Sequence, residues 1–150
     1  MKIQGRCHCG NIRFELDWPD DVRPIPARAC GCSFCTRHGG VWTAHPRAPL
    51  RVAQRDAGEV TAYRFGTETA DFHVCRRCGV APVVTSTIDG RVHAVANVNA
   101  FVDVDPGLLQ HAAVSFDGED AGDRLARRQR HWIGEVVFVD AVTATTATYD

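Results

Sequence analysis

Seven cysteines in three short groups are the residues of this sequence best suited to chemistry. The groups are Cys7-His8-Cys9-Gly10, Cys30-Gly31-Cys32-Ser33-Phe34-Cys35 and Cys75-Arg76-Arg77-Cys78-Gly79. Thiolates at this spacing can converge on a metal ion. Zinc takes four protein ligands in structural sites but only three in catalytic sites, where the fourth position stays open. Because seven cysteines divide into four plus three, the sequence predicts one closed zinc site and one open site.

The closed site is predicted at the two outer groups. Cys75 and Cys78 have the spacing of a zinc knuckle, and Cys7 and Cys9 form the second pair that completes a tetrahedron. The alternative is that one pair consists of buried thiols without a metal. Two pairs of cysteines on turns favour a structural zinc.

The open site is predicted at Cys30, Cys32 and Cys35. Two alternatives exist: a redox-active dithiol, or a structural site completed by His8, His38, His45 or His73. In an open site, a substrate thiol is held as a thiolate or a carbonyl oxygen is polarised. Both roles suit chemistry between a thiol and an aldehyde.

Charged residues beside this trio are candidates for substrate binding. Arg37 and His38 follow Cys35 and are predicted to hold a substrate carboxylate, in which arginine forms two parallel hydrogen bonds. The alternative is a solvated, flexible loop over residues 36–40. Arg28 is a weaker candidate of the same kind, and His93, His111 and His131 are interpreted as structural histidines.

The remaining pattern predicts a mainly β fold with antiparallel sheets and one C-terminal helix. Apolar residues alternate along 11–16, and Asp89-Gly90 between two apolar segments predicts a hairpin. The helix is expected from about Asp120 to Trp132. Its four arginines follow three acidic residues, which favours a solvated helix matched to its dipole over a nucleic-acid surface.

Composition limits the function classes. The chain has 150 residues and a formal net charge of −1, so one domain with no general attraction for nucleic acid is expected. No apolar run is long enough to span a membrane, and residues 1–6 lack the apolar stretch of a secretory signal. We therefore expect a cytoplasmic protein, and in that reducing compartment clustered cysteines favour metal sites over disulfides.

The order Cys-x-Cys-Gly, Cys-x-Cys-Ser-x-Cys and Cys-x-x-Cys-Gly resembles the glutathione-dependent formaldehyde-activating enzyme family, which includes the centromere protein V-like proteins. The resemblance runs from Gly5 to about Trp132. It implies a single domain over residues 1–150, with its core at about 5–139 and tent-like β-sheets pinned by two zinc ions.

The resemblance also implies roles for the cysteines. It assigns structural zinc to Cys7, Cys9, Cys75 and Cys78, and catalytic zinc to Cys30, Cys32 and Cys35. The family reaction joins glutathione and formaldehyde into S-hydroxymethylglutathione, which makes a carbon–sulfur lyase the expected activity. The alternative is a non-catalytic zinc-binding interaction module in which a fourth ligand closes the trio.

Overall fold

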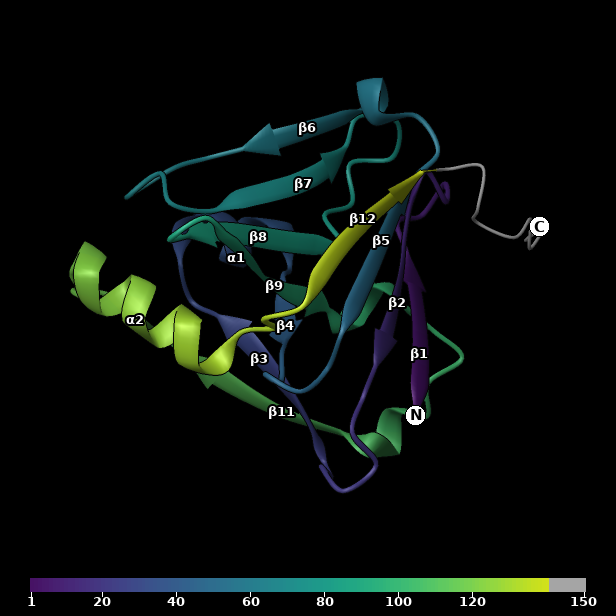
Figure 1. Cartoon of the computed structure of the whole chain (residues 1–150), viewed down its shortest axis with the longest axis horizontal. Helices are drawn as coiled ribbons and strands as arrows, with labels where there is room; N and C mark the ends of the chain where they lie inside the picture. The colour runs from purple at the N-terminus through teal and green to yellow at the C-terminus, as the bar shows by residue number, and fades with distance from the viewer. Residues whose placement is uncertain (141–150) are drawn as a thin grey trace.

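The computed structural model describes residues 1–140 and contains two β-sheets (Figure 1). The five-stranded sheet has the order β10 (Phe101–Val102), β1 (Lys2–Arg6), β2 (Ile12–Asp17), β5 (Leu50–Gln54) and β12 (Val136–Asp140). The seven-stranded sheet has the order β11 (Leu109–Val114), β3 (Ile25–Cys30), β4 (Val41–Thr43), β9 (Arg91–Asn97), β8 (Val83–Ile88), β7 (Asp71–Cys75) and β6 (Val60–Tyr63).

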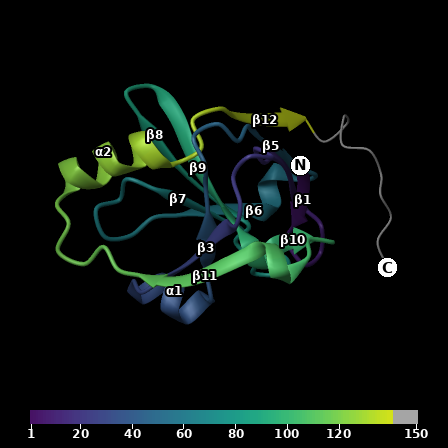
Figure 2. The same cartoon turned by 90° about the horizontal axis from the view of Figure 1, so that it is seen from below.

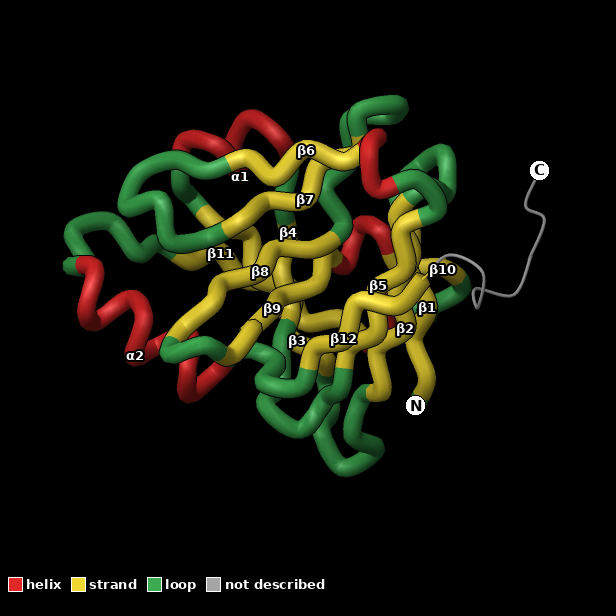
Figure 3. The backbone as a smooth tube through the Cα atoms, turned by 45° about the horizontal axis from the view of Figure 1, so that its top comes forward, coloured by secondary structure: helices red, strands yellow, loops and turns green. Residues whose placement is uncertain are grey.

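Two α-helices and three short 3₁₀-helices complete the described chain. Helix α1 spans Ser33–His38 and α2 spans Ala121–His131, and the 3₁₀-helices are Ala57–Glu59, Val98–Ala100 and Pro106–Leu108. Among the regular elements in Figure 3, strands (yellow) predominate over helices (red). The predicted mainly β class with a C-terminal helix is therefore confirmed. No helix within residues 1–140 is long and apolar enough to cross a membrane.

The sheets are mixed rather than purely antiparallel. Strand β11 pairs with β3 in parallel, and β12 pairs with β5 in parallel, whereas the other strand pairs are antiparallel. Parallel pairing needs a long connection between the two strands. Here each partner lies more than half the chain away, a separation that local sequence patterns do not reveal.

The sequence patterns match the local structure at several strands. In β2 the alternating Ile12, Phe14 and Leu16 are buried, as expected for a strand with one face in the core. The turn between β8 and β9 has positive φ at both Asp89 and Gly90, which is the geometry of a two-residue hairpin. The buried apolar side chains of the strands, including those of β2, β8 and β9, fill a common core.

Residues 36–38, directly after Cys35, belong to helix α1. They do not form the flexible loop that was considered for residues 36–40. Helix α1 begins after Cys32, whose Sγ accepts a hydrogen bond from the Cys35 backbone N–H at 3.3 Å. The helix ends at Gly39, which has the left-handed conformation common at helix C-termini. A six-residue helix is too short to show apolar periodicity, so the sequence pattern did not reveal it.

Helix α2 begins where it was expected. Asp120 caps it, with Oδ1 accepting a hydrogen bond from the Asp123 N–H at 2.8 Å. Figure 2 places α1 near one edge of the molecule and α2 near another, with the segment after β11 leading from the first side to the second. This arrangement leaves a cavity that both helices line.

Candidate metal centres

The first pair of cysteines lies on the turn between β1 and β2. The Gly10 N–H donates to the Cys7 carbonyl at 3.1 Å, and Gly10 has φ +82°. A glycine adopts this conformation without steric cost, so the chain can turn tightly around the sulfurs. The Ile12 N–H donates to Cys7 Sγ at 3.2 Å, which stabilises a thiolate at that position.

The second pair lies on the turn that follows β7. The Gly79 N–H donates to the Cys75 carbonyl at 2.8 Å, and the Cys75 N–H donates to the Val80 carbonyl at 3.0 Å. Gly79 has φ +79°, the same left-handed conformation as Gly10. Two turns of similar geometry therefore present their cysteines to each other.

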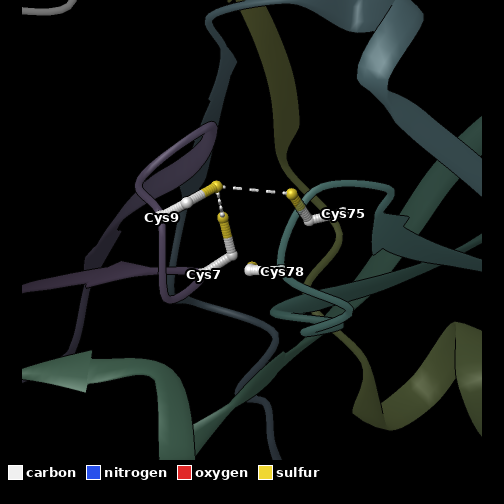
Figure 4. Close-up of side chains that lie close together, drawn as sticks. All are labelled: Cys7, Cys9, Cys75 and Cys78. Atoms are coloured by element: carbon white, nitrogen blue, oxygen red, sulfur yellow. Dashed lines mark hydrogen bonds between the residues drawn. The ribbon is translucent and has the colours of Figure 1, made fainter.

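Four sulfurs meet between these turns (Figure 4). Cys9 Sγ lies 3.8 Å from Cys7 Sγ and 3.5 Å from Cys75 Sγ, and all four sulfurs lie within 4.8 Å of one another. A tetrahedral zinc with Zn–S bonds of about 2.3 Å places its sulfurs about 3.8 Å apart. The separations fit zinc and are far too long for a disulfide, which agrees with seven free cysteines.

This four-cysteine cluster is closed. Cys7 and Cys75 are fully buried, and none of the four lines the cavity. Burial raises the pKa of Cys7 to about 12, so a cation is needed to hold this thiol as a thiolate near neutral pH. The two turns belong to different sheets, and a metal at this cluster would join the five-stranded sheet to the seven-stranded sheet.

The second cluster consists of Cys30 at the end of β3, Cys32 as the N-cap of α1 and Cys35 in its first turn. Their sulfurs lie within 4.8 Å of one another, a separation that also fits a shared zinc. Trp42 Nε1 donates to Cys35 Sγ at 3.3 Å. A hydrogen bond from Cys35 lowers the pKa of Cys30 to about 5, and the positive charge of Arg127 acts in the same direction.

Within residues 1–140, no histidine, acidic residue or further cysteine joins this trio. The four histidines considered as fourth ligands lie elsewhere. His38 Nε2 lies 2.9 Å from the Gly79 carbonyl, His45 Nδ1 accepts from the Arg47 N–H, and His73 Nε2 lies 2.7 Å from Thr85 Oγ1. His8 is exposed and belongs to neither cluster.

The trio forms part of the wall of a cavity of about 1100 Å³. Arg28 and Arg37 also line this cavity, as do Trp42, Phe65 and Phe72. His38 does not line it, because its ring stacks on Phe34 with the centroids 5.1 Å apart and points to the turn of the other cluster. The structure therefore brings Arg37 to the trio but leaves His38 outside the cavity.

Residues 2–113 match the model of a protein family described as glutathione-dependent formaldehyde-activating enzyme. This chain belongs to that family. The match covers both cysteine clusters, so membership and site geometry agree.

Two similar proteins extend this comparison. A Halomonas elongata protein, provisionally named a glutathione-dependent formaldehyde-activating enzyme, is 30% identical over 88 residues, which cover 54% of each chain. The chain thus spans about half the length of this curated relative. A crystal structure of a Rhodobacter sphaeroides protein from a structural genomics programme has a TM-score of 0.58 and 31% identity, covering 74% of this chain and 99% of that one.

Helix α2 lies beyond the segment that matches the family, yet it lines the cavity. Its contributions are Arg124, Arg127, Arg128 and His131, and the C-cap residue Trp132 lines the cavity as well. The prediction of a solvated helix is therefore wrong for these arginines, and Arg128 is only 6% exposed. Positions 124, 127, 128 and 131 lie on one helix face, a spacing that was visible in the sequence.

The other histidines interpreted as structural differ in burial. His93 is 5% exposed and its Nδ1 lies 3.3 Å from the Arg91 carbonyl, which agrees with a structural role. His111 and His131 are exposed, so burial does not explain them, and His131 contributes to the cavity.

Proposed function

We propose that the protein is a zinc-dependent carbon–sulfur lyase that forms or cleaves a thiol–aldehyde adduct, with S-hydroxymethylglutathione from glutathione and formaldehyde as its product. The observation that carries this proposal is the trio at the cavity wall. Cys30, Cys32 and Cys35 supply three thiolates, no fourth side chain among the described residues joins them, and the space beside them is large enough for a peptide-sized thiol. Family membership supports the same reaction.

The two clusters take different roles in this proposal. Cys7, Cys9, Cys75 and Cys78 hold a structural zinc, because they supply all four ligands of a tetrahedral site away from the cavity. Cys30, Cys32 and Cys35 hold the catalytic zinc. A zinc ion there would act as a Lewis acid that keeps a substrate thiol deprotonated or polarises the aldehyde oxygen.

The chain's own residues hold and orient the reactants. Arg37 binds a substrate carboxylate, and Trp42 fixes Cys35 through the Nε1–H···Sγ hydrogen bond. Phe65 and Phe72 keep part of the cavity wall apolar, which limits the water that reaches the adduct. His38 is better suited to holding α1 against the Gly79 turn than to binding substrate.

The reaction is an addition. A bond forms between the thiol sulfur and the formaldehyde carbon, the carbonyl π bond breaks, and the proton lost by the thiol ends on the new hydroxyl group. The reaction needs no oxidant, and seven free cysteines suit a reducing compartment, for which we propose the cytoplasm.

Exchange NMR tests the reaction. The rate of exchange between free formaldehyde and its glutathione adduct is measured without protein, with the zinc-loaded protein and with Cys35→Ser. We expect acceleration by the native protein only. Acceleration with another thiol but not with glutathione would keep the chemistry and change the substrate.

No acceleration with any thiol, in protein shown to contain two zinc ions, would refute the lyase. That result would leave the zinc-binding interaction module as the function.

A further inference from the structure

The cavity beside the trio is lined by an excess of positive charge. Five arginines line it, and Asp117 is the one acidic side chain among its described lining residues; the arginines are Arg28, Arg37, Arg124, Arg127 and Arg128. The whole chain carries a formal net charge of −1. Positive charge is therefore concentrated in this cavity rather than spread over the molecule.

Arg28 is the most informative of these residues. It precedes Cys30 by two positions on β3, so the two side chains lie on the same face of the strand. Its side chain is partly buried, and no hydrogen bond or ion pair is seen for it within residues 1–140. A partly buried cation without a partner is suited to binding an anion.

The arginines of α2 add charge that the protein neutralises only in part. Glu119 accepts hydrogen bonds from Arg127 at 3.0 Å and forms an ion pair of 3.8 Å with Arg124, so one carboxylate serves two guanidinium groups. Arg127 also lies over the Phe116 ring, 3.6 Å from its centroid, which fixes its position.

Arg128 contributes a third cation without an acidic partner of its own. It donates to the Thr69 carbonyl, Thr69 Oγ1 and Ser86 Oγ, all of which are neutral. Its pKa is lowered to about 10 by burial and by the nearby charges of Arg124 and Arg127. The face of α2 toward the cavity therefore keeps a net positive charge.

We propose that Arg28 and the α2 arginines form an anion subsite that binds a substrate carboxylate. The cavity would then select thiols with two or more carboxylates over neutral thiols. This inference rests on the proposed function for the thiol itself. It adds the residues that recognise the rest of the substrate, and those on α2 lie outside the segment that matches the family.

Calorimetric titration with S-methylglutathione tests the subsite. This probe keeps both carboxylates of glutathione but has no thiol, and its dimethyl ester, which keeps the amino group but lacks both carboxylates, is the matched control. We expect saturable binding of the free acid to the zinc-loaded protein and at least tenfold weaker binding of the ester. Arg28→Gln should weaken binding of the acid about tenfold, and Arg28→Lys should restore part of it.

Arg130→Gln is the control variant, since Arg130 is exposed on the same helix and does not line the cavity. Its affinity should equal that of the native protein. Equal binding of acid and ester, unchanged affinity in Arg28→Gln, or no binding of the acid to the native protein would each overturn the proposal. The ester comparison needs no variant, so it holds even where Arg28→Gln folds poorly.

The titration does not involve the addition reaction, so the two proposals fail separately. A protein that binds S-methylglutathione through Arg28 but does not accelerate formaldehyde exchange would refute the lyase and keep the subsite.

Discussion

Cys32 has two roles in the structure. It is the N-cap of α1, and its sulfur is one of the three at the cavity. Serine is a preferred N-cap, so Cys32→Ser should keep the helix and cost less than about 1 kcal/mol of stability while removing one zinc ligand. Cys75→Ser should cost several kcal/mol, roughly 10 °C or more in melting temperature, because Cys75 is buried in the closed cluster. Thermal unfolding followed by circular dichroism, with zinc content measured on the same samples, compares the two variants. Equal destabilisation would mean that the trio is also structural.

At the scale of the elements, one buried arginine helps to hold α2 against the sheet. Arg128 makes three hydrogen bonds, one of them to Ser86 on β8. Arg128→Ala should lower the free energy of unfolding by about 2–4 kcal/mol, because it leaves buried polar groups unpaired and opens a space. Arg130→Ala, on the exposed side, should change it by less than about 0.5 kcal/mol. Urea denaturation measures both, and similar values would show that Arg128 does not anchor the helix.

Some elements could be predicted from the sequence and others could not. The cysteine groups and β2 were predictable because metal ligands and alternating apolar residues are local patterns. Helix α1 was not predictable, since its six residues are stabilised by the Cys32 cap and by Gly39 rather than by an apolar stripe. The role of Arg128 depends on Thr69 and Ser86, which are distant in sequence. His38 was predicted beside the substrate from its position after Arg37, but one residue along a helix turns the side chain by about 100°.

At the scale of the whole molecule, the four-cysteine cluster connects the two sheets. Purified under reducing conditions, the protein should contain two zinc ions per chain. A coloured chelator should remove the zinc of the trio first, without loss of the far-ultraviolet circular dichroism signal. The second zinc should leave slowly and together with the fold, because metal binding at a closed site is part of the folding free energy. Release in one step, or a content of one zinc, would contradict this division. Acidification should speed both steps, because protons compete with zinc for the thiolates.

The position of α2 in the chain also has a consequence for biosynthesis. All seven cysteines have been made once the ribosome has passed Cys78, whereas Arg124, Arg127 and Arg128 are among the last described residues to be added. The trio is therefore complete while one wall of its cavity is still missing. A metal ion that binds the trio in the nascent chain does not have to pass the arginines, and the proposed anion subsite forms only when α2 packs against β8. Under the proposed function, the trio can thus take up zinc, in the order of synthesis, before the protein is able to recognise a substrate.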